Sequence, residues 1–291
     1  MSGQTDRRGG IALVAISTIV WSTSGLFVRL LALDPWAVTA GRAGVGAIVL
    51  ALYVLWRSGA TAPRAVARMG ARGVRIGIYS AVAIVVFVPA LQQTSVANVM
   101  TIYAGLPFIV AALAWVRLGE RPAAHTLIAS AVATVGLMVM LGGPGSVGMR
   151  LGDLLALAGT LVTAMMTVEA RRGAASQMLP ATLLANVLAA LVTLPFAGAL
   201  LGAGARDWGV ILALGLCGAS VGLVLYLIGS ALIPAALSAL ISTVSVPAGV
   251  FWAWVGVGEL PSAGQALGAA IVLTGVVGAL LQEQRARRLA A

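Results

Sequence analysis

The stretch W-V-R-L-G-E-R-P at residues 115–122 returns as W-V-G-V-G-E-L-P at residues 254–261. Both copies keep the frame W-V-x-x-G-E-x-P, but the positions of Arg117 and Arg121 hold glycine and leucine in the second copy. A frame that occurs twice indicates two related halves in one chain. The loss of both charges from one copy indicates that the copies lie in different surroundings.

The residues of this frame predict a tight turn between two helices. Gly119 and Gly258 can each end a helix, and Pro122 and Pro261 suit the first turn of the helix that follows. The shared glutamate, Glu120 in the first copy, is therefore expected to make cap or loop contacts and not to carry protons.

The composition is that of a membrane protein. The chain is 60% hydrophobic and only 9% charged, with a mean hydropathy of +1.05. Soluble domains carry roughly 25% charged residues, so this chain cannot cover a water-facing surface. Charge-poor stretches of about 18–22 residues, long enough to cross a hydrocarbon core of roughly 30 Å, recur along the chain. They are 11–31, 36–56, 76–93, 95–116, 123–141, 153–170, 179–200, 209–230, 235–255 and 263–281. We predict an all-α membrane protein with ten transmembrane helices.

The arginines predict its orientation. The chain has 18 arginines and no lysine. With a cytoplasmic N-terminus, the cytoplasmic segments hold fourteen of them and the outer loops only Arg150 and Arg206. Cytoplasmic loops are enriched in arginine, so both termini are predicted to be cytoplasmic in a multi-pass protein of the bacterial inner membrane. The net charge of +10 thus indicates topology and not a nucleic-acid partner. The first hairpin faces the cytoplasm and keeps its arginines, whereas the second faces outward.

Five predicted helices precede the glycine-rich stretch 141–149 and five follow it. An odd number of crossings per half means that the second half inserts upside down. We therefore expect two inverted five-helix repeats, residues 1–145 and 146–291, in one integral membrane domain. Inverted repeats that rock about a central site are a transporter architecture.

Several motifs together identify a known family. W-S-T-S-G (21–25), A-L-x-x-T-S (90–95), L-P (106–107) and W-x-x-L-G-E-R (115–121) in a 5+5 arrangement resemble the EamA type of the drug/metabolite transporter superfamily. The resemblance covers nearly the whole chain. It implies a central cavity lined by the first, third, fourth, sixth, eighth and ninth helices, with the fifth and tenth as scaffold.

Within this family the chain is most similar to bacterial exporters of aromatic amino acids, which also pass the cationic herbicide paraquat. The resemblance implies an inner-membrane secondary transporter that exports small metabolites, amino acids above all, by alternating access. The alternatives are a transporter of another class, such as nucleotide sugars or drugs, and a non-transporting membrane scaffold.

Trp21 is the leading candidate for contact with substrate. It lies halfway along the first predicted helix, next to Ser24, whereas the other tryptophans lie at predicted helix ends and are expected to anchor in the headgroup region. These are Trp36, Trp56, Trp115, Trp208, Trp252 and Trp254. An indole in mid-membrane needs a hydrogen-bond acceptor, and its face can stack on a ring or a cation. The alternative is buried packing.

Further candidates lie in the fourth and ninth predicted helices. Asn98 and Thr101 are three residues apart and share one face, with Tyr103 on another flank. Ser242 and Ser245 lie in the corresponding part of the ninth helix. These groups either face substrate or bond to their own preceding turn.

Prolines and tyrosines complete the set of candidates. Pro89, Pro107 and Pro247 interrupt helical hydrogen bonding and are predicted hinges. Tyr79 is a candidate for substrate contact, although Tyr79 and Tyr226 both suit anchoring at the cytoplasmic interface.

The remaining polar residues exclude other kinds of protein. Neither a carboxylate nor a histidine is predicted at mid-membrane, because Glu169 is expected to form an ion pair at the cytoplasmic edge. This favours uniport, exchange or a coupling that needs no central carboxylate. Because Cys217 is the sole cysteine and enzyme motifs are absent, we expect no catalytic residues, no metal site and no cofactor. The expected partners are a small-molecule substrate and the lipid bilayer; the oligomeric state is left open.

Overall fold

The computed structural model describes residues 2–59, 64, 67, 69–94, 99, 102–141, 151–258 and 260–290, and its regular elements there are helical. The first half contains α1 (Ser2–Ser22), α2 (Ser24–Arg29), α3 (Pro35–Ser58), α5 (Gly70–Gln93), α7 (Leu106–Leu118) and α8 (Ala124–Met140). The second half begins with α9 (Leu151–Arg172), α10 (Ala175–Thr193) and the short 3₁₀ turns η2 (Leu194–Phe196) and η3 (Gly198–Gly202). It continues with α11 (Ala205–Leu214), the π-helix η4 (Gly215–Gly222), α12 (Leu223–Leu232), α13 (Ala235–Ser242), α14 (Ser245–Val257) and α15 (Ala263–Ala290).

These elements confirm the predicted all-helical membrane fold. Seven helical stretches in the described residues are long and apolar enough to cross a membrane, and α7 and α8 are shorter apolar helices. The first predicted span corresponds to α1 followed by α2. The span at 153–170, which carries acidic residues at both ends, is the continuous helix α9.

Some predicted spans are interrupted, contrary to the expectation of continuous helices. The first span breaks at Thr23, where the Thr23 and Ser22 hydroxyls bond the carbonyls of the preceding turn. Side chains of this kind compete with the helical ladder. The ninth span breaks at Thr243 and resumes at Ser245 as α14, and α7 begins just after a turn at Gly105.

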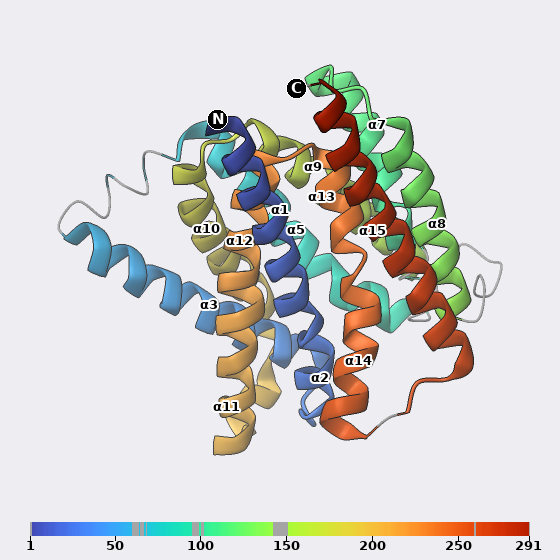
Figure 1. Ribbon diagram of the computed structural model, residues 1–291. Coiled ribbons are helices and arrows are strands. Elements are labelled where there is room, and N and C mark those ends of the chain that lie inside the picture. Colours follow the sequence, from blue (N-terminus) through green and yellow to red (C-terminus); the bar gives the residue numbers. More distant parts are fainter. Residues whose placement is uncertain are drawn as a thin grey trace.

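The two halves pack against each other through pairs of helices that the repeat relates: fifth with fifth, second with second, and first with third in both directions. The fifth helix of each half, α8 and α15, lie side by side, as do α5 with α9, α1 with α12, and α3 with α10. In Figure 1, α8 runs down from the upper end and α15 runs up to it, and both chain termini lie at that end. These four pairs are antiparallel, as expected for inverted halves, whereas α5 also packs against α10, and both of those helices begin at the end where α9 finishes.

Glycines permit the closest of these contacts. A Cβ atom on Gly136 of α8 would lie 2.8 Å from the carbonyl oxygen of Gly268 in α15. Small residues let helix backbones approach closely in lipid, where packing replaces the hydrophobic effect between helices. The α8–α15 pair therefore has the contacts of a rigid scaffold.

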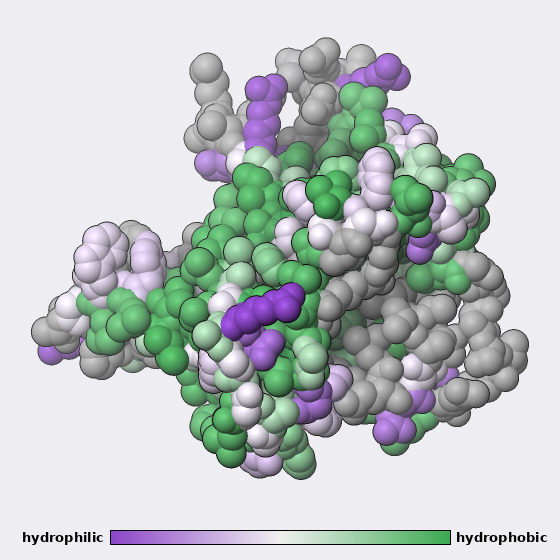
Figure 2. Space-filling view, turned by 90° about the horizontal axis from the view of Figure 1, so that it is seen from below, coloured by the Kyte–Doolittle hydropathy of each residue, from purple (hydrophilic) through white to green (hydrophobic). Residues whose placement is uncertain are grey.

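The outer surface is apolar. Many large hydrophobic side chains on the spans are exposed, among them Trp56, Val116 and Leu212. Figure 2 looks from below onto the lower end of the bundle, and hydrophobic residues are frequent even there. Along the helices, the exposed large side chains are mostly hydrophobic. This is the surface of a chain surrounded by lipid and not by water.

The repeated hairpins have the predicted glycine caps but not the predicted proline positions. Gly119 and Gly258 adopt left-handed conformations, with φ of 69° and 74°, and end α7 and α14. The following helices begin two residues after the prolines, so the prediction that proline starts them is wrong. In the second hairpin the reason is Ser262, which caps α15 by exchanging hydrogen bonds with Gln265.

Candidate functional site

Trp21 joins the two halves at the point where the first span breaks. Its indole Nε1 donates a hydrogen bond of 2.9 Å to the carbonyl of Gly218 in η4. Its ring lies 5.0 Å from the ring of Tyr226 in α12, measured between centroids. The hydroxyl of Tyr226 in turn lies 2.9 Å from Thr167 Oγ1 of α9. The contacts therefore run from the first span through the eighth to the sixth.

Tyr226 corrects one expectation. Its side chain is 1% exposed, and it packs in the main apolar cluster of the bundle. A tyrosine anchored in the headgroup region keeps its hydroxyl in water, so the interfacial interpretation is wrong for Tyr226. Tyr79, on α5, is half-buried and packs against the same cluster.

The acceptor of the Trp21 bond lies in a π-helical segment. Within this π-helix, η4, the hydroxyl of Ser220 donates to the carbonyl of Gly215, five residues earlier, at 2.8 Å. Gly222 makes room for the indole, because a Cβ there would lie 2.8 Å from Trp21 Nε1. Sequence reasoning missed this segment, although glycines at 215, 218 and 222 mark it. Such segments are frequent at functional sites.

A second tryptophan reaches the same break in the first span. Trp252 of α14 is half-buried, and its Nε1 donates to Ser22 Oγ at 2.9 Å. The prediction that Trp252 anchors in the headgroup region is therefore wrong. Ser24, at the start of α2, lies against Gly218, because a Cβ added to that glycine would be 3.1 Å from Ser24 Oγ.

The fourth span contributes another aromatic contact. Tyr103 meets Phe87 of α5 edge to face at 5.7 Å, and its hydroxyl bonds to Thr163 of α9. The predicted site residues Asn98 and Thr101 lie outside the described residues. The structure thus brings Tyr103 to the α5–α9 contact, whereas Trp21 lies at the contact of the first and eighth spans.

The polar groups of the ninth span bond locally. Ser242 Oγ donates to the carbonyl of Ala239 at 2.7 Å, and Ser245 Oγ donates to that of Ser242 at 2.8 Å. This is the geometry of the second alternative, in which each hydroxyl bonds to its own preceding turn. Both bonds lie at the break between α13 and α14.

The predicted hinge prolines lie at or near irregular backbone. Pro107 lies in the first turn of α7, directly after the turn at Gly105. Pro247 lies in the first turn of α14, directly after the break at Thr243. Pro89 lies within α5, one turn before that helix ends. Two of the three thus occupy equivalent places in the two halves.

A buried carboxylate at one end of the bundle lies close to three arginines. Glu169, 8% exposed at the end of α9, lies 3.1 Å from Arg75, 3.6 Å from Arg117 and 3.9 Å from Arg72. The predicted ion pair of Glu169 is confirmed, but its partners come from α5 and α7 and not from the neighbouring arginines. We call these four side chains the Glu169 cluster.

Neighbouring residues add further contacts between the two halves. Arg171 Nε donates to Glu120 of the first hairpin at 2.9 Å, and Arg171 Nη1 donates to the carbonyl of Ala231 at 2.9 Å. Arg172 donates to the carbonyl of Arg117. These contacts tie the ends of α7, α9 and α12 together. We call this the arginine-rich end; it is the upper end in Figure 1.

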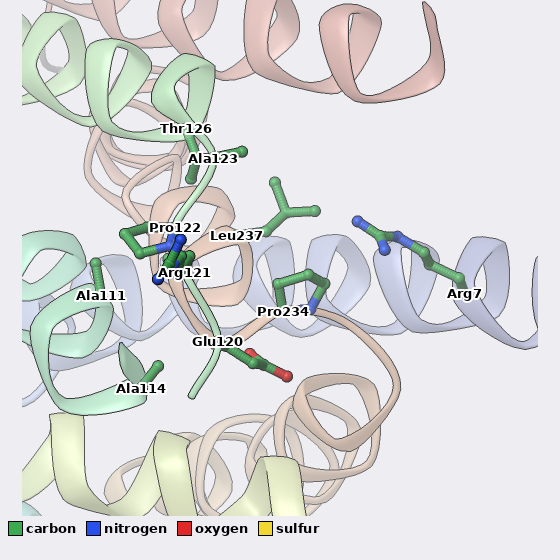
Figure 3. A pocket seen from close by; sticks show the side chains of 11 residues that line it. Arg7, Ala111, Ala114, Glu120, Arg121, Pro122, Ala123, Thr126, Pro234 and Leu237 are labelled. Atoms are coloured by element: carbon green, nitrogen blue, oxygen red, sulfur yellow. The ribbon is translucent and has the colours of Figure 1, made fainter. Parts of the chain in front are cut away.

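A pocket of about 150 Å³ opens at the same end (Figure 3). Glu120, Arg121 and Arg7 supply its charged groups, and the rest of its lining is mostly apolar. The lining comes from α1, from α7 and α8 with the hairpin between them, and from the start of α13. The pocket therefore lies between the two halves.

The sequence of the chain matches one family twice. The pattern of the EamA-like transporter family fits residues 8–142 and again residues 150–281. The chain belongs to the EamA-like transporter family. It is accordingly a multi-pass membrane transporter made of two related halves, and not an enzyme.

A solved crystal structure has the same fold as this EamA-like transporter. The similarity covers 98% of this chain and 100% of the other, with a TM-score of 0.78 and 21% sequence identity. At this identity the likeness shows the fold alone. No curated protein matches the chain.

Proposed function

We propose that this transporter exports amino acids, aromatic ones preferred, and that it also accepts flat cations such as cationic drugs. The observation that carries this is Trp21, whose indole lies half-buried between the halves and is held by the carbonyl of Gly218. Trp21 supplies an aromatic face where the first and eighth spans meet, and the buried ring of Tyr226 packs against it at 5.0 Å. Aromatic faces bind rings by stacking and cations through the ring quadrupole.

Alternating access follows from how this surface is placed. A substrate at Trp21 touches both halves, so rocking of one half against the other would open it to one side and then to the other. The breaks at Thr23 and Thr243, and the turn at Gly105, provide points where helix segments can tilt. We assign Pro89, Pro107 and Pro247 to these hinges.

The other predicted positions complete the proposal. We assign Ser24, Tyr79 and Tyr103 to the path of the substrate, and we add the predicted positions Asn98 and Thr101, which lie outside the described residues. Ser242 and Ser245 bond to their own turns, so we assign them to the break in the ninth span. The arginine-rich end faces the cytoplasm of a bacterial cell, as does each terminus. The halves divide near residue 145, between the two segments that match the family.

Counterflow in proteoliposomes tests the substrate and the site separately. Proteoliposomes that contain the purified protein and are loaded with unlabelled phenylalanine or tryptophan should take up the radiolabelled amino acid with saturable kinetics. A nucleotide sugar should not compete with this uptake. Trp21→Ala should lower this flux about tenfold, because it removes an aromatic contact and an interhelical hydrogen bond. Trp56→Ala is the matched control, since Trp56 is 82% exposed on the lipid-facing surface.

Each outcome has its own consequence. Absence of saturable amino-acid flux in the wild type would refute the substrate assignment. Normal flux in Trp21→Ala would be consistent with the substrate assignment but would show that Trp21 is not part of the site.

A further inference from the structure

The pocket at the arginine-rich end lies apart from Trp21 and carries charges of both signs. Figure 3 shows the Arg7 side chain reaching toward it from α1, with Glu120 and Arg121 on the hairpin opposite. Pro234 and Leu237 close it from the second half. A molecule bound here would touch both halves at the end that we assign to the cytoplasm.

We propose that this pocket is a docking site for the ammonium–carboxylate head of a zwitterionic amino acid. The proposal rests on the proposed function and adds the chemical class that the chain selects before the substrate reaches Trp21. Arg121 and Arg7 attract the carboxylate, and Glu120 accepts from the ammonium.

The mixture of charges distinguishes this ligand from simpler ones. Glu120 is paired with Arg171 at 2.9 Å. The excess charge of the pocket therefore comes from Arg7 and Arg121, which attract a carboxylate and repel a plain amine. An ammonium on the same ligand gains Glu120 as a second partner. A zwitterion satisfies both sets of charges at once. Charge-assisted hydrogen bonds of this kind are roughly twice as strong as neutral ones.

The size and the walls of the pocket also suit a head group. Its volume of about 150 Å³ is roughly ten times the 10–15 Å³ that a cavity needs to hold one water molecule. It lies below the roughly 300–1,000 Å³ of pockets that enclose a whole ligand. The pocket therefore has the size of a site for a head group and not for a whole ligand. Ala111, Ala114 and Leu237 form apolar walls, which strengthen the electrostatic attraction.

Docking at Glu120 is connected to the contacts that close this end. Glu120 Oε1 holds Arg171 Nε at 2.9 Å, and Arg171 also binds the carbonyl of Ala231 in the second half. An ammonium at Glu120 shares that carboxylate and weakens its hold on Arg171. Occupation of the pocket thus loosens a contact between the halves.

The proposal is tested with two variants, each of which replaces one charged side chain of the pocket by glutamine, and with three related substrates. The substrates are phenylalanine, its decarboxylated amine and its deaminated acid, applied from the arginine-rich end to oriented proteoliposomes. Arg121→Gln should raise the KM for phenylalanine about tenfold, the effect of one lost charged hydrogen bond, and leave the KM for the amine unchanged or lower. Glu120→Gln should raise the KM for phenylalanine and lower that for the acid.

Arg206→Gln is the control, because Arg206 opens α11 at the opposite end of the bundle and should change none of these values. The proposal is overturned if Arg121→Gln and Glu120→Gln shift all three substrates equally or leave all KM values unchanged. If the wild type transports phenylalanine in that case, the proposed function stands and only the docking site fails. A wild type that transports none of the three would refute both.

Discussion

Glu169→Gln should loosen the arginine-rich end, because it removes one charge and keeps the shape of the side chain. Glu169 is the acidic partner that Arg72, Arg75 and Arg117 share, so the variant leaves these three arginines facing one another without it. The closed arrangement of this end loses three attractions and gains their mutual repulsion. An open arrangement, in which the ends of α5, α7 and α9 separate, loses much less electrostatic attraction, because these side chains are no longer in contact there.

The magnitude follows from distance and exposure. The carboxylate side chain is 10% exposed, but its three partners are 40%, 44% and 48% exposed, so solvent screens each pair. Exposed pairs contribute about 0.2–1 kcal/mol each, and only the contact with Arg75 has the short distance of a hydrogen-bonded pair. We therefore expect a loss of about 1–2 kcal/mol, which shifts the equilibrium between closed and open forms about 5- to 30-fold.

Distances between paired spin labels measure this shift. Cys217 is the sole cysteine, so a Cys217→Ala background carrying Ala124→Cys and Ser176→Cys places one label on each half at this end. The open population should grow in Glu169→Gln and grow less in Arg75→Gln, which leaves the carboxylate two partners. Unchanged distance distributions in Glu169→Gln, with normal folding, would refute the assignment of the Glu169 cluster as a closing contact.

Two further predictions concern stability. Gly136→Ala should lower the melting temperature in detergent, because its Cβ would lie 2.8 Å from backbone atoms of α15; the expected cost is about 1–3 kcal/mol. Gly278→Ala, whose Cβ would meet nothing within 4 Å, is the control, and equal shifts in both variants would contradict the reasoning. Asp34→Ala should cost about 0.5–2 kcal/mol, because Asp34 caps α3 by accepting from the backbone N–H groups of Trp36 and Ala37. A melting temperature equal to that of the wild type would show that this cap contributes nothing.

Most of the fold could be predicted because its signals are local. Length and hydropathy identify a span without reference to any other, and the loss of Arg117 and Arg121 from the second hairpin indicates the inversion. The glycine ends of both hairpins were also predictable, since a left-handed cap favours glycine at that position. The Ser262 cap also has a local signature, a serine followed three residues later by a glutamine, but the adjacent Pro261 suits a helix start equally well.

The candidate site was predicted only in outline. Trp21 was identifiable because its depth in the first span is unusual for tryptophan. Its acceptor is a carbonyl 197 positions away in a π-helical segment, and a backbone carbonyl has no signature in sequence. Trp252 and Tyr226 were misassigned for a related reason: position along a helix predicts depth but not the direction of the side chain.

The sequence by itself determined that the chain spans a membrane as two inverted halves, because the cost of placing charge or backbone in lipid is set by each segment alone. The tertiary structure decided which groups meet: Trp21 with Gly218, Glu169 with the arginines of α5 and α7, and Glu120 with Arg171. Those contacts depend on how helices from distant parts of the chain pack. In lipid that packing is governed by shape and close approach, which no single segment encodes.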